Sequence, residues 1–172
     1  PFLSADDKEW ILGKSLAEVL KWPDNVWMKP QGQVVPHAYG FIYHQIMRDD
    51  VVPNVPIIMN TFYPPNQPSM RRSIQFGKTL FEAVEGWDSD KKVALIASGG
   101  LSHFVWDEQL DQTFMKYFRE YDFEGLAQID NNSYQSGTSE VKLYVPVMVA
   151  TSQLGFKMNV VDYVPVIRTE AG

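Results

Sequence analysis

A short apolar run over residues 93–97 leads through Ser98 into Gly99 and Gly100, and Ser102 and His103 follow after Leu101. Such a run between turn signals is typical of a buried strand, and glycines after it let the backbone approach a ligand closely. Open α/β sheets bind their ligands at the carboxyl ends of their strands. The segment therefore predicts an α/β fold and makes His103 the leading acid/base candidate.

The segments on either side support the same fold class. Residues 55–60 have the pattern of another buried strand, and residues 69–87 that of an amphipathic helix, so a right-handed crossover would join two parallel strands. Residues 156–163 are rich in valine and aromatic side chains and are predicted as a further strand. We expect one domain over residues 1–172, with a mostly parallel or mixed central sheet and flanking helices.

Capping residues and apolar spacing predict further helices. They fall over residues 5–21 after an N-cap at Ser4, over residues 39–47, from Asp107 onward, over residues 123–129, and from Glu140 towards Thr151. Pro146 should either lie in the early turns of the last helix or kink it, and Glu140 falls in the first turn of that helix. His37 should lie just before the helix over residues 39–47.

Composition excludes several classes of protein. The chain has 172 residues, of which 45% are hydrophobic, and this size suits one domain with a substantial core. A net charge of -6 argues against a nucleic-acid partner held through its phosphates. The absence of cysteine rules out disulfides, thiolate metal sites and a cysteine nucleophile. With no membrane-length apolar run and no signal-peptide pattern, we expect no membrane partner and a cytoplasmic location.

Five sequence words occur in a defined order along the chain. They are PHAYGF at 36–41, NTFYPPNQP at 60–68, GGLSH at 99–103, SGTSEV at 136–141 and DYVP at 162–165. Through these words the chain resembles the catalytic subunits of the extradiol ring-cleavage dioxygenases of the protocatechuate 4,5-dioxygenase superfamily. The resemblance extends over nearly the whole chain, and it begins partway through the family's length, so we expect parts of the family domain to be missing at both ends.

The resemblance implies an Fe(II) cofactor and a set of site residues. Family members hold Fe(II) with two histidines and one glutamate, and Glu140 matches the glutamate. The two histidine ligands would come from the amino-terminal part that this chain lacks. His103 matches the catalytic acid/base, and His37 a second active-site histidine near the substrate hydroxyls. Ser102 and Gly100 are expected to bind the substrate.

The resemblance also implies a substrate and partners. Two histidines and a carboxylate leave open positions on Fe(II) where a catechol and dioxygen can bind side by side. The TFYPPNQ and SGTSE words are most similar to the branch that acts on protocatechuate, gallate or methylgallate. The partners would be a small aromatic diol and O2, and the protein is expected to be an oligomer in which a small second subunit could take part.

Other interpretations stay open for the same residues. His103 could serve only as a hydrogen-bonding histidine at a strand end, and Glu140 as a first-turn glutamate favoured by the helix dipole. His37 could cap or pack, and His44 has no role that the resemblance assigns. The chain could also be a metal-free accessory or interaction protein of the same superfamily. A hydrolase using Ser102 and His103 is disfavoured, because adjacent turn residues rarely point at each other and no Gly-x-Ser-x-Gly elbow is present.

Overall fold

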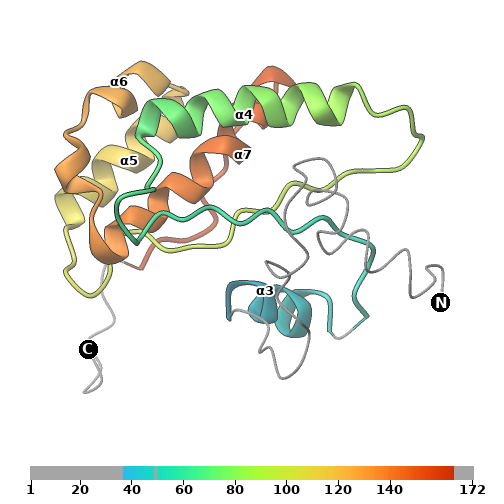
Figure 1. Cartoon of the computed structure of the whole chain (residues 1–172), viewed down its shortest axis with the longest axis horizontal. Coiled ribbons are helices and arrows are strands. Elements are labelled where there is room, and N and C mark those ends of the chain that lie inside the picture. Colours follow the sequence, from blue (N-terminus) through green and yellow to red (C-terminus); the bar gives the residue numbers. More distant parts are fainter. Residues whose placement is uncertain (1–36, 49, 165–172) are drawn as a thin grey trace. The chain divides into compact units, whose positions relative to one another are not determined.

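The computed structural model of the protein describes residues 37–48 and 50–164 (Figure 1). The chain divides into two compact units, Pro1–Ile58 and Met59–Gly172. The helix predicted over residues 5–21 lies outside the described residues. That residues 1–172 belong to one domain stays a prediction.

The first unit contains a short helix that changes its winding. Helix α3 covers His37–Phe41 and continues as the π-helix η3, Ile42–Ile46. The Tyr39 hydroxyl donates to the Ile57 carbonyl at 2.9 Å, and the Tyr43 hydroxyl donates to Asn54 Oδ1 at 3.0 Å. The predicted helix over residues 39–47 is therefore present, but it begins at His37, which lies in the helix and not before it.

The second unit is built from helices that begin at side-chain caps. Helix α4 covers Met70–Glu85, α5 covers Glu108–Glu120 and α6 covers Phe123–Gln128. Their N-caps are Ser69, Asp107 and Asp122, and each accepts a hydrogen bond from a backbone N–H of the first turn. The helices predicted over residues 69–87, from Asp107 and over residues 123–129 are confirmed. Within the described ranges, none of the helices combines the length and apolarity that a membrane span requires.

The segment that carries Glu140 differs from the prediction. After the 3-10 turn η4, Asn131–Ser133, a longer 3-10 helix, η5, covers Ser136–Leu143, and α7 covers Tyr144–Gln153. Glu140 therefore lies in η5 and not in the first turn of an α-helix. Pro146 gives the physical reason: deep inside an α-helix its ring would clash with the carbonyl four residues earlier, whereas the first turn of α7 accepts it.

The predicted central sheet is wrong. Among the described residues there is no strand, and this part of the chain is mostly helical. The segments predicted as strands belong to no helix or strand, and they expose apolar side chains, among them Ile58 at 78%, Ile96 at 49% and Val161 at 92%. Residue preference for strands reports a local tendency, but a strand also needs a neighbour to satisfy its backbone N–H and C=O groups. None of these segments pairs with another in the described part.

The core of the second unit lies where α4, α5, α6, η5 and α7 meet. Its buried members come from all of these elements and from the loop before η5: Met70, Phe114, Phe118, Leu126, Tyr134, Val141, Val145 and Val149. Helices α4 and α7 pack directly against each other. Their backbones come close at Gly77, where an added Cβ would lie 2.6 Å from Val149 Cβ and 2.8 Å from the Pro146 carbonyl oxygen.

We therefore predict that Gly77→Ala destabilises the protein, because the methyl group would force α4 and α7 apart. Overpacking of this kind costs about 1–3 kcal/mol, which lowers Tm by several degrees. Gly40→Ala is the matched control, since Gly40 is also helical and nothing lies within 4 Å of an added Cβ. Thermal unfolding followed by circular dichroism checks both variants. Equal Tm values for the two variants would contradict the close approach of α4 and α7.

A second prediction concerns alkaline stability. Tyr134 is fully buried and its hydroxyl donates to the Leu126 carbonyl at 2.9 Å. Burial, and secondarily the nearby Tyr117, raises the pKa of Tyr134 above its ordinary value of 10.0. Folding therefore favours the protonated phenol, so its stabilising contribution is complete below pH 10 and is lost as the pH rises further.

Tyr134→Phe should be less stable than wild type at neutral pH by about 1 kcal/mol, for the lost hydrogen bond. Above pH 10 its free energy of unfolding should fall less steeply than that of wild type. Urea titrations at several pH values measure both effects. Tyr63→Phe, at an exposed position, should keep the wild-type slope. A wild-type slope in Tyr134→Phe would show that Tyr134 does not titrate on unfolding.

Candidate active site

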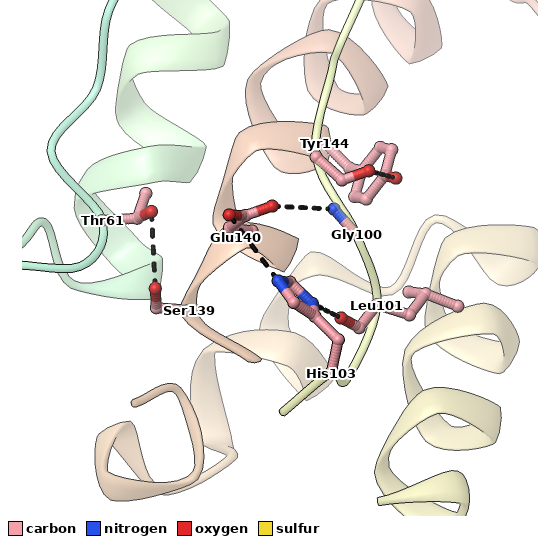
Figure 2. Close-up of polar contacts among 8 residues, drawn as sticks. Thr61, Gly100, Leu101, His103, Ser139, Glu140 and Tyr144 are labelled. Atoms are coloured by element: carbon pink, nitrogen blue, oxygen red, sulfur yellow. Dashed lines mark hydrogen bonds and ion pairs between the residues drawn. The ribbon is translucent and has the colours of Figure 1, made fainter. Parts of the chain in front are cut away.

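Glu140 and His103 lie side by side in the second unit (Figure 2). Glu140 Oε2 accepts a hydrogen bond from the Gly100 backbone N–H at 3.1 Å. Its other oxygen, Oε1, is 3.7 Å from His103 Nε2. Both side chains are partly exposed, at 36% for His103 and 29% for Glu140. The structure thus brings together three of the predicted site residues, from segments that are 40 residues apart.

The ring of His103 is held in one tautomer. Its Nδ1 lies 2.7 Å from the Leu101 carbonyl oxygen. Because a carbonyl oxygen only accepts hydrogen bonds, Nδ1 must carry a proton and donate. In the neutral imidazole the lone pair is then on Nε2, the nitrogen that faces Glu140. Nε2 and Oε1, 3.7 Å apart, are then both acceptors, so they make no hydrogen bond with each other, and both attract a proton or a cation.

Two glycines allow this close arrangement around His103. A Cβ on Gly100 would lie 2.9 Å from His103 Nδ1, and a Cβ on Gly137 would lie 3.0 Å from His103 Cδ2 and still closer to the His103 carbonyl oxygen. The chain turns sharply beside both contacts. Phe104, next to His103, has φ of 65°, and Ser136, next to Gly137, has φ of 53°. Both are non-glycine residues in the left-handed region, where a backbone is strained.

Two further contacts hold the segment that carries Glu140. The Tyr144 hydroxyl donates to the Gly99 carbonyl, and burial together with the charge of Glu140 raises the pKa of Tyr144, so that this phenol stays protonated. The hydroxyls of Ser139 and Thr61 meet at 3.5 Å, and both residues are buried. Figure 2 shows these contacts on either side of the Glu140 and His103 pair.

Ser102 is committed to a different partner from His103. Its backbone N–H donates to Asp111 Oδ1 at 2.8 Å, and its hydroxyl donates to Asp111 Oδ2 at 2.9 Å. The same hydroxyl oxygen accepts from the Asp107 backbone N–H at 2.7 Å. The hydroxyl proton of Ser102 therefore points at Asp111, which gives the hydrolase alternative no support in the geometry.

Sequence reasoning missed Asp111 and Tyr163. Asp111 is only 2% exposed, and the Tyr163 hydroxyl donates to its Oδ2 at 3.2 Å. Burial, followed by the charge and hydrogen bond of Asp111, raises the pKa of Tyr163 to about 12. The sequence held a signal for Asp111. It precedes the buried Phe114, Met115 and Phe118 by three, four and seven positions, so it is a carboxylate on the core face of a helix.

These groups line a cavity of about 400 Å³ that is largely open to solvent. The residues that line it are Gly100, Leu101, Ser102, His103, Asp111, Glu140, Asp162, Tyr163 and Val164. This volume falls in the usual range for a small-molecule site. A few polar side chains converge on it, as expected for a site that orients a ligand.

Comparison with protein families settles the relationship of the chain. The family of the catalytic LigB subunit of aromatic ring-opening dioxygenase matches residues 32–167. The chain belongs to this family. The predicted kinship is confirmed, and the family supports an aromatic ring-opening dioxygenase activity. No curated protein and no solved structure gives a significant match.

The donor set of this LigB-family protein fits Fe(II) in kind. Carboxylate oxygen is one of the ligand types of non-haem Fe(II) sites, and Glu140 presents Oε1, which accepts no hydrogen bond from His103 at 3.7 Å. Within the described residues, no three histidine, aspartate or glutamate side chains converge as a metal site would require. Glu140 is therefore a fitting first ligand, and the two further histidine ligands stay a prediction.

The other histidines lie in the first unit of the LigB-family chain. His37 begins α3 and His44 lies in η3. The prediction that His37 is a second active-site histidine is not tested by this arrangement and stays a prediction. Ser102 and Gly100 line the cavity, and their contact with substrate is likewise still a prediction.

Proposed function

We propose that this protein is an Fe(II)-dependent extradiol dioxygenase, which opens the ring of a catechol-type aromatic acid with O2. The observation that carries the proposal is the juxtaposition of His103 Nε2 and Glu140 Oε1, 3.7 Å apart, at the wall of the cavity. An acid/base and an anionic metal ligand at one point are what this reaction needs, and the family match supports the ring-opening chemistry.

Glu140 is the proposed iron ligand contributed by the described residues. Its Oε2 is held by the Gly100 N–H, which leaves Oε1 free to bind a cation. When bound, Fe(II) would supply adjacent positions at which the diol and dioxygen come together. The resemblance assigns the two remaining ligands to histidines, and that set forms part of the proposal.

His103 is the proposed acid/base. Because Nδ1–H is anchored on the Leu101 carbonyl, Nε2 is the nitrogen that can take a proton from a substrate hydroxyl. The same nitrogen can return the proton at a later stage of ring opening. Its place beside Glu140 sets the proton transfer next to the metal ligand, and the tight contacts of Gly100 and Gly137 fix the ring there. His37 is proposed to assist near the substrate hydroxyls.

The proposed substrates are protocatechuate, gallate or methylgallate. Each has a single ring with vicinal hydroxyls, and a cavity of about 400 Å³ suits that size. Gly100 and Ser102 are proposed to contact the substrate from the turn. Assembly into an oligomer with a small second subunit, and a cytoplasmic location, complete the proposal.

Oxygen uptake tests the function directly. The intact protein, purified without oxygen and loaded with Fe(II), should consume O2 with at least one of the three substrates and produce the absorbance of a ring-opened product. The same protein kept free of iron is the control. A protein that binds no iron and consumes no O2 with any of the three would instead support the metal-free accessory role.

We predict that Glu140→Ala abolishes iron retention, because the site loses its only anionic ligand among the proposed three. Glu140→Gln separates charge from shape, since its amide oxygen can still accept from the Gly100 N–H. It should also lose most of its iron. Glu82→Ala, at an exposed position of α4, is the matched control and should retain iron. Metal analysis of the purified variants decides this, and wild-type iron in Glu140→Ala would remove Glu140 from the site.

We also predict that His103→Phe keeps its iron but slows ring opening by about a hundredfold to ten-thousandfold, the usual contribution of a general acid/base. The effect should be mainly on kcat, with little change in KM. His44→Phe is the control, because no role is proposed for His44. Oxygen uptake at matched iron content measures both variants. Loss of iron would make His103 a ligand, and wild-type kcat would leave it structural.

A further inference from the structure

Among the described residues of the second unit, Asp111 is the carboxylate that accepts the most hydrogen bonds, and the proposed mechanism makes no use of it. It lies in the first turn of α5 and is 2% exposed. Three donors converge on its two oxygens: the Ser102 N–H at 2.8 Å, the Ser102 hydroxyl at 2.9 Å and the Tyr163 hydroxyl at 3.2 Å. A buried carboxylate with this many donors is held firmly, since each donor stabilises its charge.

The same contacts close the loop that carries His103. Ser102 stands at the start of the loop and Asp107 at its end, and the Asp107 N–H donates to the Ser102 hydroxyl oxygen at 2.7 Å. Asp111 holds Ser102 by both its backbone and its side chain. His103 is the first residue inside this closed loop, so its backbone position is set by α5 through Asp111.

Tyr163 connects a second part of the cavity wall to the same carboxylate. Its hydroxyl shares Asp111 Oδ2 with the Ser102 hydroxyl. Tyr163 and its neighbours Asp162 and Val164 line the cavity together with residues 100–103, which lie far from them in the sequence. One buried side chain therefore ties together two segments of the wall that are about 60 positions apart in the chain.

We propose that Asp111 is a positioning residue for His103, which it holds in register with Glu140 through Ser102, with Tyr163 completing its set of donors. The part of this inference that concerns turnover rests on the proposed dioxygenase function. The part that concerns the position and tautomer of His103 does not. Asp111 acts through Ser102 and does not touch the reacting atoms.

Asp111→Asn is the sharpest variant, because it preserves size and removes acceptors. An amide group in either orientation turns one carboxylate oxygen into a donor. The new N–H₂ donor would take the place either of Oδ2, where it faces the two hydroxyl donors, or of Oδ1, where it faces the Ser102 N–H. In both cases a donor meets a donor, so the present hydrogen bonds cannot all be kept. Glu108→Gln is the matched control. It removes the same charge from the same helix turn, but Glu108 is exposed.

In the iron-loaded protein, Asp111→Asn should lower kcat by about 10- to 100-fold with little change in KM, as for other residues that orient a catalytic group. Glu108→Gln should keep the wild-type kcat. Ser102→Ala should show the same kcat effect as Asp111→Asn, and the double variant should have a kcat no lower than either alone, because both break one chain of contacts. A change of KM in Ser102→Ala would report its proposed substrate contact, so the KM criterion applies to Asp111→Asn. Ser102→Thr, which keeps the hydroxyl, should restore much of kcat. A rise in KM alone, or additive effects, would overturn the proposal.

A second measurement does not depend on activity. Nitrogen-15 spectra of the histidine rings in metal-free protein, at a pH where imidazole is neutral, should show His103 protonated at Nδ1 in wild type. The chain has 3 histidines, so His103→Phe assigns the signal. Asp111→Asn should shift His103 to a mixture of tautomers. If Asp111→Asn does not fold, Ser102→Ala and Tyr163→Phe, which each remove a single donor, should show the same shift.

The two measurements separate the two claims. A wild-type protein without dioxygenase activity, in which Asp111→Asn still changes the tautomer, would reject the proposed function and retain the positioning role. An active wild-type enzyme in which Asp111→Asn keeps both kcat and the Nδ1–H tautomer would retain the proposed function and reject the positioning role.

Discussion

The burial of Val141, Val145 and Val149 is the constraint on which the rest of the site depends. Each is at most 1% exposed, and the three follow one another at intervals of four residues across η5 and α7. Burying a valine contributes about 1.5–3 kcal/mol, so this face cannot turn away from the core at low cost. Glu140 directly precedes Val141, and its position at the cavity is therefore fixed by core packing.

Bringing His103 to Glu140 requires a backbone that few sequences tolerate. Gly100 and Gly137 leave no room for a Cβ at their contacts with His103. Phe104 and Ser136 adopt positive φ at the two points where the chain turns. Strained residues of this kind cost on the order of 1–3 kcal/mol each and persist where the surrounding contacts determine the conformation. Here the surrounding contacts include those of Asp111 and the buried hydroxyls of Ser139 and Thr61.

The sequence correctly predicted helix starts, which depend on side chains within one turn. It wrongly predicted strands, which depend on partners far away along the chain. Ser69 and Asp107 marked the starts of α4 and α5, because a cap acts within one helical turn. The segments at residues 93–97, which are apolar, and 156–163, which contain valine and aromatic side chains, suggested strands, but strand formation depends on a partner, which no local pattern contains. Pro146 was placed correctly near a helix start, yet its consequence for Glu140, a 3-10 setting, was not foreseen.

The candidate site shows the same division. The Gly-Gly and SGTSE words located His103 and Glu140, and the structure places the two together. The role of Asp111 was missed because its partners, Ser102 and Tyr163, are 9 and 52 residues away along the chain. The signal that the sequence did hold is the spacing in α5, which places the charged Asp111 on the same buried helix face as Phe114 and Phe118.

The two oxygens of Glu140 have different neighbours, and the backbone fixes one of them with a hydrogen bond. Oε2 receives its hydrogen bond from the neutral Gly100 N–H, which fixes the carboxylate without cancelling its charge. Oε1 faces His103 Nε2 at 3.7 Å, beyond hydrogen-bond reach. The backbone therefore fixes Glu140 through one oxygen, and the other oxygen lies beside the imidazole of His103 at the wall of the cavity.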